Sequence, residues 1–349
     1  PKQKRSRITS ETMLVATVIL LLAYAAVSYC VGPDTQDDIY SDSSNGGANC
    51  HAPWNYNRKN MTKGPYCWGT FAPKCDGERQ SPINIETDAV SYKSFSPRYE
   101  NLTYEISGTL RIIHHAPKFK INNDKSYVLS KIPFREGKRF RLVEFHLHFH
   151  NGDGKGSEHR INCNGHRGEL HFVHEEIGST KNTGTPNTNF AVLAIFVEKG
   201  GSTEIGLEPF FTNLESLSAC GKKENVTLGN FTFMNNLKDL YTYEGSLTTP
   251  PCNETVIWLI KSSTIRVSEN HFNILKNLTR DNTQRAEHGN VRPPFPMNDR
   301  EVYANFKVPN GKNNENHKGN NNDENNGNEC TEWYESRQCS TDNDDDDDD

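Results

Sequence analysis

The stretch Glu144-Phe-His-Leu-His-Phe-His150 decides how the central part of this chain folds. Along Arg141–His150, polar and apolar side chains alternate, which is typical of a β-strand with one buried face. We expect one face to be core, formed by Val143, Phe145, Leu147 and Phe149, and the other to carry Leu142, Glu144, His146, His148 and His150. The polar face predicts a strand that borders a cleft, where a metal ion would bind.

Two histidines of this strand form a candidate metal site. His146 and His148 are two residues apart, so their side chains point to the same face of a strand. His171, in the motif Glu169-Leu-His171, can complete a trio from a neighbouring strand. Three neutral nitrogen ligands leave the fourth position of tetrahedral Zn²⁺ open, which indicates a catalytic site rather than a closed structural one. An isolated His-x-His pair is more often a surface or core pair, so the rest of the sequence has to support this interpretation.

The surrounding sequence predicts a mainly-β domain over residues 50–309. Short β-type runs alternate there with Gly, Pro and Asn. The clearest runs are Thr109–His114, Arg141–His150, Glu169–His174, Phe190–Val197 and Thr255–Lys261. Long amphipathic helical patterns are few, and the best short one is Glu269–Leu278.

Further motifs support the metal site by a family resemblance. They are Gly77-Glu-Arg-Gln-Ser-Pro-Ile-Asn-Ile85, Gly156-Ser-Glu-His159, Gly168-Glu-Leu-His-Phe-Val-His174 and Gly245-Ser-Leu-Thr-Thr-Pro-Pro251. From about Trp54 to Phe306 the chain resembles the alpha-class carbonic anhydrases. The resemblance implies an α+β, mainly-β fold with a large central, mostly antiparallel twisted sheet and a conical zinc cleft. It also implies a carbonate dehydratase, a lyase that reversibly hydrates CO₂ to bicarbonate and a proton.

The resemblance assigns roles to individual residues. His146, His148 and His171 would bind zinc, which lowers the pKa of its water from 15.7 to about 7. Thr248 would accept a hydrogen bond from the zinc-bound hydroxide and donate one to Glu158, and Thr249 would help to bind bicarbonate. The apolar wall for CO₂ would comprise Val173, Val192, Leu247 and Trp258.

Three more residues are expected around the ligands. By the resemblance, Glu169 would accept the free imidazole N–H of His171, and the backbone carbonyl of Asn290 would hold another ligand. Glu144 departs from the family, which usually has Gln beside the first ligand. A carboxylate there is expected to add negative charge near zinc.

The proton shuttle is a second departure from the family. An ungapped comparison through Leu110-Arg-Ile112 puts Pro117 at the family's shuttle position. His115 and His114 lie two and three residues earlier, and we take His115 as the shuttle candidate. His150 is another candidate, and simple surface histidines are an open alternative.

The cysteines indicate an oxidising compartment. Nine cysteines become eight if Cys30 is removed with a signal peptide. The resemblance implies a disulfide between Cys75 and Cys252, and the remaining cysteines cannot be paired from sequence, so a disulfide-linked homo-oligomer is open. Candidate glycosylation sites are Asn60, Asn101, Asn225, Asn230 and Asn277, whereas occupancy of the Asn253 sequon would crowd the cleft mouth.

The two ends of the chain differ in composition from its middle. Residues 1–30 combine basic residues with the apolar run Met13–Val27 and are interpreted as a signal peptide, with an uncleaved membrane anchor as the alternative. Residues 31–49 are a polar linker. The Asn-rich and Asp-rich tail, residues 310–349, carries 13 acidic and 3 basic residues, a net charge of −10. Since the whole chain has a net charge of −6, residues 1–309 have a net charge of +4. The tail is expected to be disordered, and nothing in the chain suggests nucleic-acid binding.

The acidic tail extends the resemblance to the nacrein-like proteins of mollusc shell matrix. Carboxylates without partners hold Ca²⁺ weakly and in number. This similarity implies a secreted enzyme of the extracellular matrix whose tail interacts with calcium or calcium carbonate mineral in biomineralisation. Only fragments of the nacrein repeat occur, such as Lys318-Gly-Asn320. The alternatives are a solubilising tail, or a structural, calcium-binding matrix protein with weak or vestigial activity.

Overall fold

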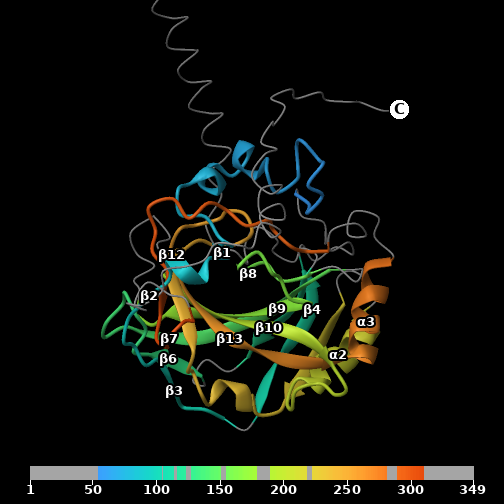
Figure 1. Cartoon of the computed structure of the whole chain (residues 1–349). Coiled ribbons are helices and arrows are strands. Elements are labelled where there is room, and N and C mark those ends of the chain that lie inside the picture. The colour runs from blue at the N-terminus through green and yellow to red at the C-terminus, as the bar shows by residue number, and fades with distance from the viewer. Residues whose placement is uncertain are drawn as a thin grey trace, which may run out of the picture. The chain divides into compact units, whose positions relative to one another are not determined.

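One large sheet dominates the protein (Figure 1). The computed structural model describes residues 54–103, 105–113, 116–122, 127–150, 155–178, 189–217, 222–280 and 289–309. Twelve strands in these ranges form the sheet, in the order β11-β4-β5-β7-β9-β10-β13-β12-β14-β2, with β6 paired to both β3 and β7. Among these pairs, β10–β13 and β14–β2 are parallel and the others are antiparallel. The prediction of a mainly-β fold with a mostly antiparallel central sheet is confirmed.

The strands are short at the sheet edges and long at its centre. The sheet comprises β2 (Ser91–Tyr92), β3 (Arg98–Glu100), β4 (Ile106–Ile113), β5 (Ala116–Ile121), β6 (Val128–Ser130), β7 (Arg139–Phe149), β9 (Gly168–Glu176), β10 (Phe190–Gly200), β11 (Lys223–Leu228), β12 (Leu240–Gly245), β13 (Val256–Ser268) and β14 (Tyr303–Ala304). A separate parallel pair is formed by β1 (Asn84–Ile85) and β8 (Arg160–Ile161). The five predicted strands correspond to β4, β7, β9, β10 and β13.

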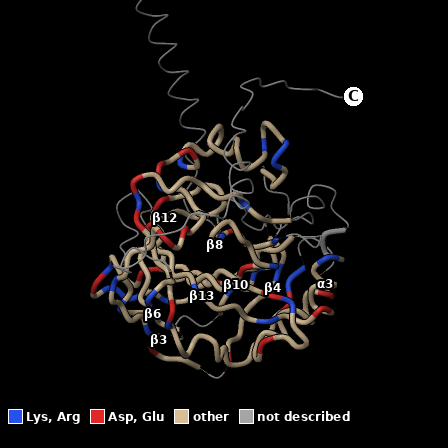
Figure 2. Tube along the Cα trace, viewed as in Figure 1, with Lys and Arg blue, Asp and Glu red and all other residues tan. Residues whose placement is uncertain are grey.

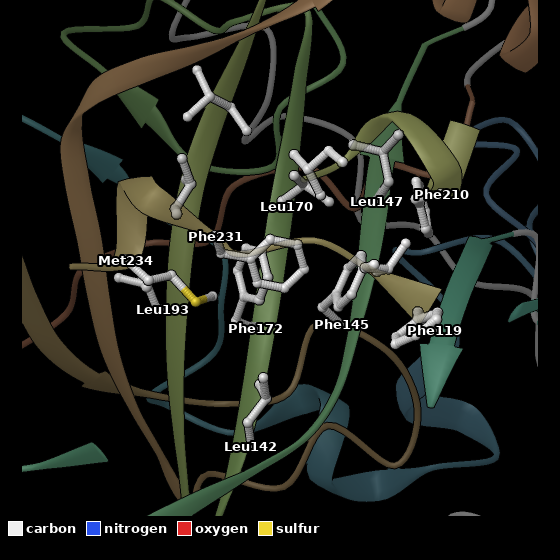
Figure 3. Close-up of a cluster of buried hydrophobic side chains, with 14 of the residues drawn as sticks. Phe119, Leu142, Phe145, Leu147, Leu170, Phe172, Leu193, Phe210, Phe231 and Met234 are labelled. Atoms are coloured by element: carbon white, nitrogen blue, oxygen red, sulfur yellow. The ribbon is translucent and has the colours of Figure 1, made fainter. Parts of the chain in front are cut away.

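The main hydrophobic core covers one face of the sheet. Phe145, Phe172 and Phe231 lie close together there, with ring centroids of Phe145 and Phe172 5.0 Å apart (Figure 3). Cross-strand register explains this packing, because Phe119, Phe145 and Phe172 are directly opposite one another on β5, β7 and β9. Side chains from β9, β10, β12 and β13 form a second cluster on the other face, including Val192, Tyr243 and Trp258.

A β-bulge in β7 interrupts the regular alternation of faces that was predicted for this strand. Leu142 is opposite His174 on β9, but the next pair is Glu144 with Val173, so the register shifts by one residue. Leu142 therefore lies in the main core with Phe145 and Leu147, while Val143 packs on the second cluster, on the face of the histidines. The prediction was wrong for these two residues because it assumed an uninterrupted strand.

Helices are few in the described residues. They are α2 (Glu208–Leu214) and α3 (Glu269–Arg280), with short 3₁₀ turns at Trp68–Thr70, Pro73–Asp76, Thr87–Ala89, Glu215–Leu217 and Thr232–Met234. Helix α3 starts directly after β13, and its Phe272 and Leu275 join the main core whereas Asn273 is exposed. This confirms the predicted helix at Glu269–Leu278.

Charged residues of both signs are mixed around the outer parts of the described chain, and the central strands β10 and β13 are mostly uncharged (Figure 2). Among the sequon asparagines, Asn101, Asn225 and Asn277 are exposed, and Asn60, Asn230 and Asn253 are half-buried. No helix in the ranges given above is long and apolar enough to cross a membrane. The predicted signal segment 1–30, the linker 31–49 and the tail 310–349 lie outside the described residues.

Candidate metal centre

Three histidines from two adjacent strands converge on one face of the sheet. His146 on β7 is directly opposite His171 on β9, and His148 follows two residues later on the same face. Ring centroids are 5.2 Å apart for His146 and His171, and 4.5 Å apart for His148 and His171. One nitrogen of each ring lies within 4.8 Å of the others. Such a group could hold a metal ion.

Hydrogen bonds fix which nitrogen two of these rings present. The Nδ1–H of His148 donates to the backbone carbonyl of Asn290 at 2.6 Å, which leaves Nε2 free of a proton. The Nε2–H of His171 donates to Glu169 Oε1 at 2.7 Å, which leaves Nδ1 free. Glu169 also accepts hydrogen bonds from the backbone N–H and Nδ1–H of His159, at 2.8 and 2.6 Å. These buried contacts determine ring orientation and tautomer.

His146 is held differently. Its Nδ1 lies 3.3 Å from Glu144 Oε1, which leaves Nε2 as its candidate ligand atom. The second oxygen of Glu144, Oε2, is 2.9 Å from Lys118 Nζ. The carboxylate that the sequence analysis expected to add negative charge is therefore paired with a lysine.

Lys118 was missed by the sequence analysis. It lies on β5 directly opposite His146, whereas Pro117 precedes it and so points to the other face. An unusual carboxylate at position 144 was a signal that a cation should be nearby, but no local pattern identified which one. His114 and His115, the shuttle candidates, lie outside the described residues, and His150 is half-buried directly after β7.

Glu158 is a fully buried carboxylate beside the histidines. Its Oε1 accepts the backbone N–H of Arg292 at 2.9 Å, and its Oε2 is 3.3 Å from His148 Nε2 and 3.9 Å from His171 Nδ1. Burial raises the pKa of Glu158 well above its usual value, although the Thr248 hydroxyl beside it acts in the opposite direction.

Two buried acceptor atoms meet at this point. Glu158 Oε2 and His148 Nε2 have no hydrogen-bond partner among the described residues. Since the His148 proton is on Nδ1, Nε2 offers a lone pair to its surroundings, and so does the carboxylate oxygen. A bound cation would stabilise this arrangement, so the residues present fit a metal ion.

Burial also keeps the three imidazoles in the metal-binding form. It lowers the pKa of His148 well below the usual value, against the hydrogen bond to Asn290. It lowers the pKa of His171 to about 4 despite the nearby charge of Glu169, and lowers the pKa of His146 in the same direction. Neutral imidazole is the form that ligates metal ions, so the site needs no deprotonation near neutral pH.

An apolar row borders the histidines. Val173 on β9 is opposite Val192 on β10, which is in turn opposite Trp258 on β13. Val173, Val192 and Trp258 are all more than 90% buried, and the Trp258 ring centroid is 4.8 Å from that of His171. Leu247 is partly buried against the same cluster. The row carries no charge close to the three nitrogens, and the indole N–H of Trp258 already donates to the Ser246 carbonyl at 3.1 Å.

The loop after β12 brings Thr248 to this site. Thr248 is buried and Thr249 is half-buried, and the Thr249 carbonyl accepts the backbone N–H of Cys252 at 2.8 Å. A disulfide joins Cys252 to Cys75, with Cα atoms 4.9 Å apart, and Cys67 and Cys163 are disulfide-bonded as well. The backbone N–H of Ser81, in the Gly77–Ile85 motif, donates to Ser246 Oγ at 2.9 Å. Residues 75–81, distant in sequence, thus hold the loop near both of its ends, at Ser246 and Cys252.

The chain is similar in sequence to proteins of known family. The sequence profile of the eukaryotic-type carbonic anhydrases matches residues 63–306. Carbonic anhydrase 1 of Monodelphis domestica is 31% identical over 268 residues, which cover 73% of this chain and 98% of that protein. Carbonic anhydrase 4 of Mus musculus is 30% identical over 292 residues, which cover 81% of this chain and 90% of that protein.

Proposed function

The chain belongs to the eukaryotic-type carbonic anhydrase family, and from that premise we propose that it catalyses the zinc-dependent, reversible hydration of CO₂ to bicarbonate and a proton. The observation that carries the proposal is the convergence of three buried, neutral imidazoles beside an apolar row of side chains. Such a site combines a cation-binding centre with a wall for a substrate that has no charge.

We assign the ligand nitrogens from the hydrogen bonds of each ring. Zinc would be held by Nε2 of His146, Nε2 of His148 and Nδ1 of His171. When bound, zinc lowers the pKa of a water molecule to about 7 and so supplies a nucleophile at neutral pH. Glu144, Asn290 and Glu169 orient the three rings, one partner for each.

The remaining residues place the reactants. Thr248, beside the buried Glu158, would accept a hydrogen bond from the nucleophile and direct its lone pair at CO₂. Val173, Val192, Leu247 and Trp258 would exclude water from the space that CO₂ enters. Thr249, at the partly exposed end of the same loop, would bind the bicarbonate product.

Metal removal tests this function directly. The purified full chain is expected to hydrate CO₂ far faster than buffer alone, to lose that activity after dialysis against a zinc chelator, and to regain it with one equivalent of Zn²⁺. Stopped-flow detection of the released proton measures the rate, and metal analysis gives the zinc content. A protein that holds one zinc per chain yet hydrates CO₂ no faster than buffer would support the alternative, a matrix protein with a vestigial site.

We further propose that the protein is secreted and acts in calcium carbonate deposition. Support for export comes from the N-terminal basic and apolar segment, from the six sequons and from the disulfide between Cys75 and Cys252. Support for the mineral role comes from the net charge of −10 in residues 310–349, because hard cations such as Ca²⁺ prefer oxygen ligands. In this proposal residues 1–30 are a signal, 31–49 a linker and 50–309 the enzyme domain.

Deleting residues 310–349 should separate the two roles. The shortened protein is expected to keep its CO₂ hydration rate but to lose its effect on the onset and amount of calcium carbonate precipitation. A full chain with His148→Ala serves as the matched control, because it keeps the tail and loses the enzyme site. Equal precipitation with and without the tail would contradict a mineral-directed role, and slower hydration after deletion would show that the tail serves the enzyme.

A further inference from the structure

Lys118 is a cation at the metal centre that the roles above do not use. It lies on β5 opposite the ligand His146, and its Nζ is 2.9 Å from Glu144 Oε2. The side chains of Lys118 and Glu144 are 16% and 19% exposed, so their ion pair is largely shielded from water. Shielding this ion pair from water costs desolvation free energy, so its position next to a ligand indicates a role beyond surface charge.

The three ligands are not held equally well. His148 and His171 are 1% exposed and donate short hydrogen bonds, at 2.6 and 2.7 Å, to Asn290 and Glu169. His146 is 16% exposed, and its Nδ1 lies 3.3 Å from Glu144 Oε1 without a well-aligned hydrogen bond. The orientation of His146 thus depends on where the Glu144 carboxylate is kept.

Lys118 provides the restraint that Glu144 otherwise lacks. One oxygen of Glu144 faces Lys118 and the other faces His146, so the carboxylate bridges the lysine and the ligand. A carboxylate at the edge of a shielded site, without a counter-ion, would turn toward solvent and leave the His146 Nδ1 side unsupported. The ammonium of Lys118 holds it inward.

We propose that Lys118 is a positioning residue for the metal centre, which acts through Glu144 to orient the first ligand, His146. The inference rests on the proposed zinc site, but it concerns how firmly the metal is held rather than the reaction. It predicts that substitutions of Lys118 change zinc retention only when residue 144 carries a carboxylate.

The rate of zinc release to a chelator tests this prediction. With Lys118→Met or Glu144→Ala, the zinc-loaded protein is expected to release its metal about tenfold faster than the wild type, the lower end of the effect for groups that support ligands. The double variant should release zinc no faster than Glu144→Ala alone, because the lysine acts through the carboxylate. Unchanged release after Lys118→Met, or losses that add in the double variant, would overturn the proposal.

Two control variants separate positioning from a purely structural ion pair. Lys118→Arg keeps a cation beside Glu144 and should hold zinc within about twofold of the wild type. The exchange Lys118→Glu with Glu144→Lys keeps an ion pair but places an ammonium next to the His146 N–H, so it should release zinc as fast as Glu144→Ala. Thermal unfolding of the metal-free proteins shows whether the exchanged pair is intact.

The results that would refute the positioning role of Lys118 differ from those that would refute the proposed catalytic function. Wild-type zinc retention by the exchanged protein would show that the pair only stabilises the sheet, which refutes positioning. A protein that binds zinc tightly but does not hydrate CO₂ would refute the proposed function and leave the release measurements valid. The two proposals therefore fail on different observations.

Discussion

Replacing His148 with alanine is expected to abolish tight zinc binding and to lower the kcat/KM of CO₂ hydration by at least about three orders of magnitude. The substitution removes one of the three proposed nitrogen ligands, a ring that Asn290 and Glu158 contact in the folded protein. The two remaining imidazoles cannot hold Zn²⁺ tightly, because a catalytic zinc site needs three protein ligands besides its one open position. Zinc content after gel filtration and stopped-flow hydration rates measure the two effects.

A second buried histidine provides the matched control for this prediction. His174 lies on β9, fully buried, where Nδ1 is 3.1 Å from the Ala191 carbonyl and Nε2 is 2.9 Å from the Tyr99 hydroxyl. Its replacement by alanine should lower the free energy of unfolding by about 1–3 kcal/mol, because polar partners lose their hydrogen bonds, while zinc binding persists. If His174→Ala lost zinc as His148→Ala does, the metal effect would reflect general damage to the sheet.

Local pattern was enough to predict the candidate ligands because the relevant geometry is short-ranged. The i, i+2 spacing of His146 and His148 places both on one strand face in any regular strand. Helix α3 was predictable for the same reason, since its apolar residues recur at helical spacing within one segment. The large, mostly antiparallel central sheet was expected from the family resemblance rather than from composition, and the order of its strands was not predicted.

Features that depend on cross-strand register could not be predicted in this way. The bulge at Leu142–Glu144 exists only relative to β9, and it moves Val143 to the face of the histidines. Lys118 and Glu144 are 26 positions apart in the sequence, so their pairing depends on the register of β5 against β7. A sequence pattern read along one strand contains neither piece of information.

The disulfide between Cys75 and Cys252 is expected to contribute strongly to the stability of the folded protein. It closes a loop with a sequence separation of 177 residues, for which chain-entropy arguments give about 5 kcal/mol. Since domains unfold with about 5–15 kcal/mol, replacing both cysteines with alanine should remove a third or more of the stability. Denaturant unfolding of the double variant measures this loss without reducing the other disulfides at Cys67 and Cys163.

The same substitution should leave the metal centre nearly intact at 25 °C. The side-chain amide of Gln80 still donates to the carbonyls of Lys74 and Cys252, at 2.9 and 3.3 Å, so the segments joined by the disulfide stay together in the folded protein. If the lost disulfide acts by giving the unfolded chain more conformational freedom, folding becomes slower. If it acts through lost packing around Trp54 and Trp68, unfolding becomes faster. Stopped-flow folding kinetics distinguish the two. Loss of CO₂ hydration in step with stability would contradict this expectation, because it would mean that the disulfide also positions the Thr248 loop.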